Sequence, residues 1–486
     1  MLLEDLATDA LTLPDGAGRI EVAGLSSDSR QIGPDFLFAA LPGTASDGAS
    51  FAGDAMDRGA GVILASRSAS IDIKPGIAIL RVDDPRLALA QMAARFYARQ
   101  PENLVAITGT SGKTSVAAFV RQIFEQAGKE AASVGTLGVV SRAWSAYGNL
   151  TTPDPVALHA TLDRLAGDGV THAAIEASSH GLDQRRLDGI RIAAAGFTNL
   201  GRDHMDYHAT VSDYLAAKLR LFSAILPANG TAVIDMDGDR SKDVAAFAAS
   251  RGQSLIHIGR AGAELRLISL VPDRFRQILN LEAFGKSHEI VLPLAGEFQA
   301  SNALVAAGLA IAVGIEVDAA LAALNTLAGA PGRIELVGHK ANGAMIFVDY
   351  AHKPDALDSV LTALRPMTGG QLIVVLGAGG DRDPGKRALM GDVASRLADV
   401  VIVTDDNPRS EEPAAIRKAI IAAAPDSIEI GDRAGAIRQG VAMLEPGDVL
   451  CVAGKGHETG QIVGSKVFDF SDHAVVREAL AAEVSA

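Results

Sequence analysis

A glycine-rich turn carrying a lysine and a threonine lies between an apolar run and a helical pattern. Residues 104–108 read LVAIT, residues 109–114 read GTSGKT, and an amphipathic stretch then runs to a glycine at 128. Backbone N–H groups of such a turn hold phosphate oxygens, a lysine neutralises their charge, and a threonine hydroxyl can hold Mg²⁺. The stretch predicts a nucleotide site that uses Lys113 and Thr114.

This turn is shorter than the common phosphate loop. The pattern G-x-x-x-x-G-K-[ST] needs a glycine at 107, where Ile107 stands, and the first glycine is Gly109. The alternative is an ordinary strand-to-helix turn. Since a buried strand precedes the turn and a helix follows it, we favour nucleotide binding.

Further polar residues follow other apolar runs. Glu176 ends the run HAAIEA, where a carboxylate beside a phosphate loop is well placed for Mg²⁺. In the segment TNLGRDHMDYH, His204, Asp206 and His208 are either metal ligands or parts of a polar loop. Lys218, on a predicted helix, reads by itself as a surface lysine.

Composition limits the class of protein. The chain has 486 residues, a net charge of −14 and one cysteine. The negative charge argues against a general binder of nucleic acid or of an anionic membrane. The single cysteine excludes an intramolecular disulfide, and Cys451 is expected in a buried strand. Without a signal peptide pattern or a long apolar run, the chain is expected to be cytoplasmic.

The order of patterns predicts an α/β fold with mainly parallel sheets. Continuous apolar runs such as those at 172–177, 194–200 and 231–237 suit strands buried on both faces, and amphipathic stretches lie between them. A second such series follows Pro331. We predict three domains: a smaller α/β domain at 1–99, a central phosphate-loop domain at 100–331, and a Rossmann-like domain at 332–486.

Ten spaced segments together resemble the bacterial Mur ligase family. They are TGTSGKT, EASSHGL, TNLGRDHMDYH, YLAAKLRLF, GEFQASNALVA, PGRIE, DYAHKPDAL, GGDRDPGKR, DDNPR and AGKGHE, and they extend over essentially the whole chain. The resemblance implies three domains and an ATP-dependent, amide-forming ligase. In that chemistry ATP phosphorylates a substrate carboxylate, an amine attacks the acyl phosphate, and phosphate leaves. Cations then matter more than a protein nucleophile, because negative charge develops.

The resemblance also implies roles for individual residues. Lys113, Glu176, His204 and Lys218 would be catalytic, and Thr114, Glu176, His204 and a carbamylated Lys218 would hold Mg²⁺. Carbamylation would turn a repelling ammonium into an anion. The ATP site would comprise Gly109, Thr110, Ser111, Gly112, Lys113, Thr114, Ser115, Asn302, Arg333 and Asp349.

A UDP-linked substrate, UDP-N-acetylmuramoyl-L-alanyl-D-glutamate, is implied as the carboxylate donor, and a monomer is expected. Leu150 stands where some relatives carry an asparagine contact, so it is left out of the site. The matching positions for this substrate are Ser27, Ser29, Thr44, Ala45, Ser46, Thr151, Thr152, Ser178, Gln184 and Arg186.

The segment TDDNPRSEEP, residues 404–413, bears on the amine substrate. By itself it predicts a turn, a helix start at Ser410 to Pro413, and an exposed Arg409. In a ligase that adds either meso-2,6-diaminopimelate or L-lysine, the arginine can instead hold the distal carboxylate that only diaminopimelate has. The implied diaminopimelate site is Arg382, Asp406, Asn407, Pro408, Arg409, Gly454 and Glu458.

Two other classes of protein explain less of the sequence. A phosphate-loop motor or kinase accounts for only the first motif. A dinucleotide-binding oxidoreductase accounts for only LGAGG, where Arg382 stands in place of the third glycine of G-x-G-x-x-G. Release of phosphate from ATP that depends on an amino acid, without redox change, separates the three classes.

Overall fold

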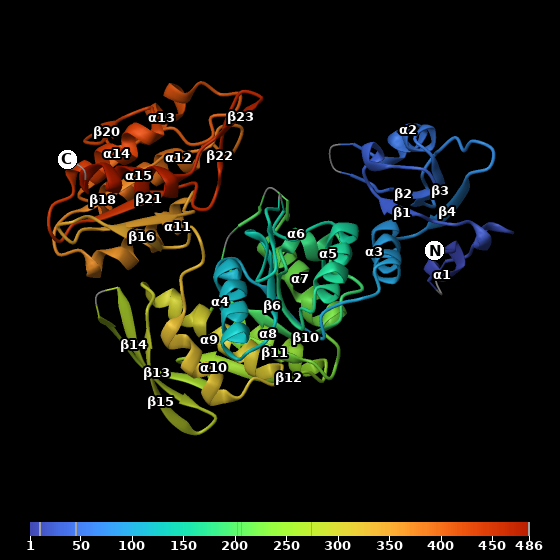
Figure 1. Ribbon diagram of the computed structural model, residues 1–486, viewed down its shortest axis with the longest axis horizontal. Helices are drawn as coiled ribbons and strands as arrows, with labels where there is room; N and C mark the ends of the chain where they lie inside the picture. The colour runs from blue at the N-terminus through green and yellow to red at the C-terminus, as the bar shows by residue number, and fades with distance from the viewer. Residues whose placement is uncertain are drawn as a thin grey trace. The chain divides into compact units, whose positions relative to one another are not determined.

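The computed structural model describes residues 1–8, 11–43, 46–148, 150–201, 203–205, 207–273 and 275–484 (Figure 1). The chain divides into two compact units. One contains Met1–Arg266 and Val305–Ala320, and the other contains Leu267–Leu304 and Leu321–Ala486.

A small parallel sheet opens the chain (Figure 1, blue). Its strands lie in the order β1 (Gly24–Ser26), β2 (Phe36–Ala40), β3 (Ala60–Ser66) and β4 (Ala78–Val82). Alternate strand residues face opposite ways. One set packs with α1 (Leu3–Leu6) and α3 (Pro85–Phe96), and the other packs with α2 (Ala52–Asp57). The result is three layers around two small cores.

The central sheet carries the phosphate loop (Figure 1, cyan to green). Its strands lie in the order β12-β11-β10-β5-β9-β6-β7-β8, and they are parallel from β12 to β6. The carboxyl ends of β5, β9 and β10 are therefore neighbours, and ligands of open α/β sheets bind at this edge. The strand bounds are β5 (Asn103–Thr108), β6 (Ala131–Gly135), β7 (Gly138–Ser141), β8 (Ser145–Ala146), β9 (His172–Glu176), β10 (Ile192–Phe197), β11 (Thr231–Asp235) and β12 (Ser254–Gly259).

Helices cover this sheet. Leucines of one helix stripe, at 158, 162 and 165, are fully buried against strand residues such as Leu104 and Ile175. Burial of apolar surface stabilises a fold by about 25 cal/mol per Å², so this packed face is a main source of the stability of the domain. The helices are α4 (Lys113–Gln126), α5 (Pro155–Gly167), α6 (Ser179–Asp183), α7 (Val211–Arg220) and α8 (Ser241–Ser250).

An antiparallel ribbon follows that the sequence analysis did not predict. It contains β13 (Leu265–Asp273), β14 (Arg276–Ala283) and β15 (Lys286–Leu292), and β14 pairs antiparallel with β15. Two helices, α9 (Glu297–Ala312) and α10 (Val317–Ala323), come next.

The last sheet is sandwiched between two helical layers (Figure 1, orange to red). Its order is β16-β17-β21-β18-β19-β20, parallel except for β16. One face packs with α11, α12 and α13, and the other packs with α14 and α15. The strands are β16 (Glu335–His339), β17 (Met345–Asp349), β18 (Leu372–Leu376), β19 (Val400–Val403), β20 (Ile428–Glu429) and β21 (Val449–Ala453).

The remaining elements complete this layer structure. The helices are α11 (Pro354–Leu364), α12 (Lys386–Leu397), α13 (Pro413–Ile421), α14 (Arg433–Met443) and α15 (Asp472–Val484). After β21 the chain forms a hairpin of β22 (Gly460–Val463) and β23 (Lys466–Asp469). Cys451 is buried in β21, as predicted.

The predicted α/β class with mainly parallel sheets is confirmed, and the strands expected at 104–108, 172–177, 194–200 and 231–237 are present. The domain boundaries at 99/100 and 331/332 stay predictions. Within the described ranges, no helix combines the length and the apolar character that crossing a membrane requires.

Candidate active site

The phosphate loop requires glycine at two places. Gly109 has a φ of +149°, and a Cβ at this position would lie 1.9 Å from Thr198 Oγ1. Gly112 takes a left-handed conformation at the N-terminus of α4. Asn199 fixes the middle of the loop, since the Ser111 N–H donates to its Oδ1 at 2.9 Å. The loop is thus held by the turn that follows β10, and its remaining amides can face a phosphate.

Two lysines meet at this loop. Lys113 Nζ donates to the carbonyls of Gly109 and Thr110 at 2.8 and 3.0 Å. Lys218, from α7, donates to the same Gly109 carbonyl at 2.7 Å and is 1% exposed. Burial, followed by the charge of Lys113, holds the pKa of Lys218 well below its usual range, although Asp203 opposes this. Lys218 is therefore not the surface lysine that its local sequence indicates.

Glu176 lies at the foot of the loop. Its Oε2 accepts from the hydroxyls of Thr114 and Thr136 at 3.0 and 3.2 Å, and its Oε1 accepts from the Thr136 N–H at 2.7 Å. A hydroxyl beside a carboxylate suits Mg²⁺, which prefers oxygen ligands. The oxygen atoms of Thr114 and Glu176 therefore fit Mg²⁺ as ligands. Among the described residues, no three histidine, cysteine or acidic side chains form a cluster that could hold a metal ion by themselves.

His204 belongs to a cluster of aromatic rings near the same loop. Its ring centroid lies 4.7 Å from that of His180 and 6.2 Å from that of Tyr214. Tyr214, which the sequence analysis did not select, lies under Lys218, with Nζ 4.2 Å from the ring centroid. Its hydroxyl is 3.3 Å from Thr110 Oγ1. Of the other two suggested ligands of this segment, His208 is buried with its ring centroid 5.2 Å from that of Tyr214, and Asp206 lies outside the described residues.

The central-domain residues expected to contact the UDP substrate form one network. Thr152 Oγ1 donates to the Glu176 carbonyl at 2.7 Å and lies 3.0 Å from Ser178 Oγ. Arg186 donates to the Thr152 carbonyl and to Gln184 Oε1, both at 2.7 Å. The fifth residue, Thr151, lies 3.0 Å from Thr136 through their hydroxyls and so joins the set to the Glu176 carboxylate.

The N-terminal residues of the expected UDP site differ in exposure. Ser29 is buried, whereas Ser27 and Ser46 are exposed. Asp28 lies between the two serines and caps the short helical turn Ser29–Gln31 by accepting from the Arg30 N–H. Thr44 and Ala45 lie outside the described residues.

Three further residues expected at the nucleotide lie together in the second unit. Asn302 donates to Gln299 Oε1 at 3.0 Å, and Arg333 lies over the Tyr350 ring at 4.8 Å. Asp349 accepts from the N–H groups of residues 334 and 351 at 2.6 and 2.7 Å. Burial raises its pKa to about 6, although Arg333 and these N–H groups act in the opposite direction.

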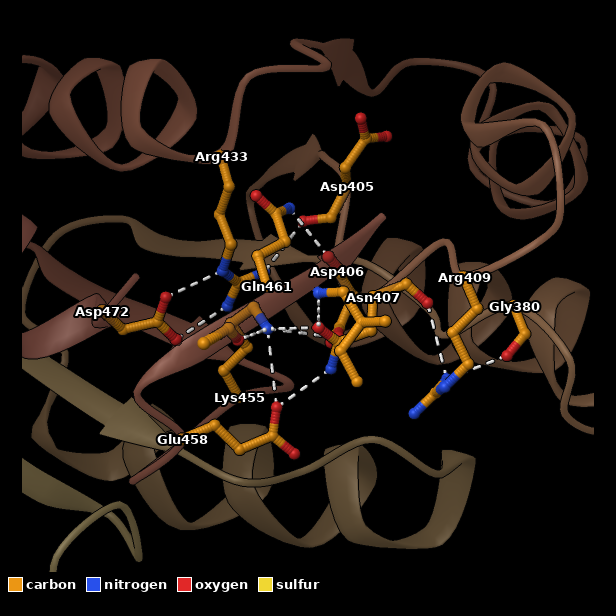
Figure 2. Close-up of polar contacts among 12 residues, drawn as sticks. Gly380, Asp405, Asp406, Asn407, Arg409, Arg433, Lys455, Glu458, Gln461 and Asp472 are labelled. Carbon is orange, nitrogen blue, oxygen red and sulfur yellow. Dashed lines mark hydrogen bonds and ion pairs between the residues drawn. The ribbon is translucent and has the colours of Figure 1, made fainter. Parts of the chain in front are cut away.

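Arg409 is half-buried, so it is not the exposed charge that its local sequence suggests. It has a left-handed φ of +54°, and its Nη1 donates to the Gly380 carbonyl at 2.8 Å (Figure 2). Backbone bonds with Ile462 and Gly464 connect it to the β22–β23 hairpin. The expected Arg382 is exposed, and its Nη1 is 3.3 Å from the carbonyl of Asp381.

The helix start predicted at Ser410 is real but is built differently. Helix α13 begins at Pro413, and Glu412 occupies the N-cap without a capping side-chain hydrogen bond. The Ser410 hydroxyl instead donates to Asp381 Oδ1 at 2.6 Å. The loop after β18 and the loop after β19 are thereby joined.

Asp406, Asn407 and Glu458 lie around one buried ammonium, that of Lys455 (Figure 2). Gly454 is next to them: its φ is +115°, and a Cβ there would lie 2.7 Å from Asp406 Oδ2. Lys455 stands in the segment AGKGHE and was not among the residues expected in the site. The signal was a charged residue between glycines at the end of an apolar strand.

A phosphate loop at the edge of a mainly parallel sheet, with a buried lysine and a carboxylate beside it, defines a nucleotide-using α/β enzyme. Three family descriptions match the chain: "Mur ligase family, catalytic domain" at residues 21–97, "Mur ligase middle domain" at 107–310, and "Mur ligase, glutamate ligase domain" at 332–456. The chain belongs to the Mur ligase family. The resemblance drawn from the ten segments is confirmed.

Similar proteins match over nearly their full length. Two curated relatives are named UDP-N-acetylmuramoyl-L-alanyl-D-glutamate–2,6-diaminopimelate ligase. The one from Mesorhizobium japonicum is 58% identical over 480 residues, with 99% of each chain covered. The one from Brucella melitensis is 56% identical and covers 100% of this chain and 99% of the relative. A solved structure of a ligase with the same name has a TM-score of 0.71 at 30% identity, covering 100% and 99%.

Proposed function

We propose that this enzyme joins meso-2,6-diaminopimelate to UDP-N-acetylmuramoyl-L-alanyl-D-glutamate, with ATP as the energy source, in the synthesis of peptidoglycan precursors. The Thr114–Glu176 pair below the phosphate loop is the observation that carries the ATP-dependent part. The names of the full-length relatives support the two substrates.

The phosphate loop binds and orients ATP. Residues 109–115 surround the phosphates, and Lys113 exchanges its carbonyl contacts for phosphate oxygens. We also assign Asn302, Arg333 and Asp349 to ATP binding, because they stand in the family segments GEFQASN, PGR and DYAH. Orientation and charge stabilisation suffice here, because phosphoryl transfer needs little covalent help from the protein.

Thr114, Glu176 and His204 are the residues that would hold Mg²⁺. When bound, the ion neutralises charge on the phosphates and on the forming acyl phosphate. Lys218 contributes through its carbamate. Burial favours the neutral amine, whose nitrogen can form a bond to the carbon of CO₂ with loss of a proton. The resulting carbamate is an anion where an ammonium would repel the ion.

Two sets of residues are proposed to bind the UDP-linked substrate. Its sugar and dipeptide are oriented by the central network of Thr151, Thr152, Ser178, Gln184 and Arg186. Its UDP end is held by the N-terminal set of Ser27, Ser29, Thr44, Ala45 and Ser46. The amine substrate binds at Arg382, Asp406, Asn407, Pro408, Arg409, Gly454 and Glu458.

We propose that the chain has domains at 1–99, 100–331 and 332–486 and that it is a monomer. We also propose a cytoplasmic location, where UDP-linked substrates and ATP are found.

The test is a panel assay on the purified protein. ATP and the UDP-linked dipeptide are supplied with meso-diaminopimelate, L-lysine or another amino acid, and phosphate release and the mass of the UDP product are measured. We expect release with diaminopimelate and a product heavier by one diaminopimelate residue. Release without an amino acid, or a product carrying another residue, would contradict the proposal.

A further inference from the structure

Lys455 is a fully buried lysine to which the proposed reaction assigns no role. It follows β21, and the exposed fraction of its side chain is 0%. Burying an ammonium is costly unless opposite charges and hydrogen bonds compensate for lost hydration. A lysine at this position therefore needs a physical reason.

Its contacts join three segments of the domain. Nζ donates to Asn407 Oδ1 at 2.8 Å (Figure 2). It also donates to the Gly460 carbonyl at 2.7 Å. It also lies 3.4 Å from Glu458 Oε2 and 3.8 Å from Asp406 Oδ1. One ammonium thus connects the loop after β19, the turn after β21 and the start of β22.

The same contacts determine what Asn407 can do. Its Oδ1 accepts from Lys455 and from the Ile462 N–H, the latter at 2.9 Å, and its Nδ2 donates to Glu458 Oε2 at 3.0 Å. A carbonyl oxygen has two lone pairs, and both are used here by the protein. Asn407 therefore orients Glu458, and a cationic group of a ligand is left to Asp406 and Glu458.

The neighbouring arginines are bonded elsewhere. Arg433 forms a two-pronged pair with Asp472, at 2.7 and 2.8 Å, and both side chains are fully buried. Arg409 donates to the carbonyls of Gly380 and Asn407. The charge of Arg433 also acts on Asp406 and Glu458, and that of Lys386 acts on Asp406. Lys455 lies within ion-pair range of both carboxylates, so its loss would make their surroundings more negative by one unit.

We propose that Lys455 is a specificity-determining residue: it sets the charge around Asp406 and Glu458 so that the site takes a zwitterionic centre in preference to a bare ammonium. This inference rests on the proposed function, in which the amine substrate carries such a centre at its far end. A more negative site attracts the bare ammonium of lysine. It gains less with a zwitterion, because the adjacent carboxylate is repelled.

The experiment separates the effect of the positive charge at position 455 from the effect of the shape of its side chain. Lys455→Met and Lys455→Gln remove the charge, Lys455→Arg keeps it, and Lys466→Met, at an exposed site on β23, is the matched control. The values of kcat/KM for diaminopimelate and L-lysine are measured at saturating ATP and UDP substrate. Both neutral variants should raise the lysine-to-diaminopimelate ratio about tenfold or more, the scale of one charge-assisted contact.

Lys455→Arg and Lys466→Met should keep that ratio within about threefold, since both variants retain the positive charge at position 455. A purely structural role would lower kcat/KM for both amino acids equally, and that result overturns the inference. It is also overturned if neither neutral variant folds by circular dichroism. Failure of the wild-type enzyme to add diaminopimelate would instead refute the proposed function, so the two failures are distinct.

Discussion

Lys113 and Lys218 donate to the same acceptor, the carbonyl oxygen of Gly109, at 2.8 and 2.7 Å. Burial first, and then the nearby charge of Lys113, lower the pKa of Lys218. Lys113 is also the lysine expected to contact the phosphates, so the nucleotide site and Lys218 share one loop carbonyl.

The first prediction concerns Lys218. Lys218→Ala should reduce ligation to less than about a tenth, since loss of one charge-assisted contact in a buried site is worth a decade or more. Added short carboxylic acids should restore part of the activity by replacing the lost anion. The assay is phosphate release at saturating substrates, with Lys242→Ala, on the exposed surface of α8, as control. Retention of more than about a tenth of wild-type turnover in Lys218→Ala would contradict the carbamate role.

Lys113→Ala separates the two substrates. The lysine contacts the carbonyls of Gly109 and Thr110 in the phosphate loop, so turnover should vanish while the UDP-linked dipeptide still binds. Isothermal titration with that dipeptide, in the absence of ATP, provides the measurement. An equal loss of dipeptide binding would show that the loop supports both sites.

Arg409 is expected to select the amino acid. Arg409→Ala should raise the KM for diaminopimelate by about ten- to a hundredfold, the range for one lost charge-assisted contact, and no gain for lysine is required. Arg409→Lys keeps the charge but not the planar fork, and it should recover little. Steady-state kinetics with both amino acids decide the matter: an unchanged KM in Arg409→Ala removes the arginine from the site.

Asp349 predicts a pH effect. Its folded pKa of about 6 lies above the usual 3.8, so between these values the folded state binds more protons than the unfolded state. Protonation of Asp349 therefore stabilises the folded state fully below about pH 4, and this contribution is lost as the pH rises through 6. It amounts to about 3 kcal/mol in total, at about 1.4 kcal/mol per pKa unit. Arg333 and the Cys451 thiol are the titratable groups coupled to this carboxyl.

Asp349→Asn resembles the protonated acid and should lack this pH dependence. Urea unfolding of both proteins between pH 4.5 and pH 7.5 measures it: the wild type should lose stability relative to the variant as the pH rises. Asp355→Asn, on the exposed side of α11, is the matched control. Parallel curves for wild type and Asp349→Asn would exclude the raised pKa.

The buried pair of Arg433 and Asp472 predicts an asymmetry in stability. Arg433→Met leaves a carboxylate uncompensated in the interior and should cost about 3–5 kcal/mol. The double change Arg433→Met with Asp472→Leu removes both charges and should recover most of that loss. Urea unfolding of the three proteins tests this, and a double variant as unstable as the single one would refute it.

Local signals in the sequence determined much of this protein. Continuous apolar runs predicted β5, β9, β10 and β11, because strands buried on both faces need no polar positions. The phosphate loop was predictable for another reason. Its glycines and Lys113 are consecutive or nearly so, so the backbone geometry and the chemistry are both visible in a short stretch of sequence. The ribbon β13–β15 was not predicted, because buried and less buried positions alternate along its strands and no continuous apolar run is present.

Only the tertiary structure decided which charges are buried. Lys218 reads as a surface lysine in the sequence, and Lys455 was not selected there, yet Lys218 is held by Gly109 and Lys455 by Asn407 and Gly460. Their partners come from strand ends that become neighbours only when the parallel sheets form. Burial and pairing of a charge depend on such long-range convergence, and no local pattern of residue types encodes it.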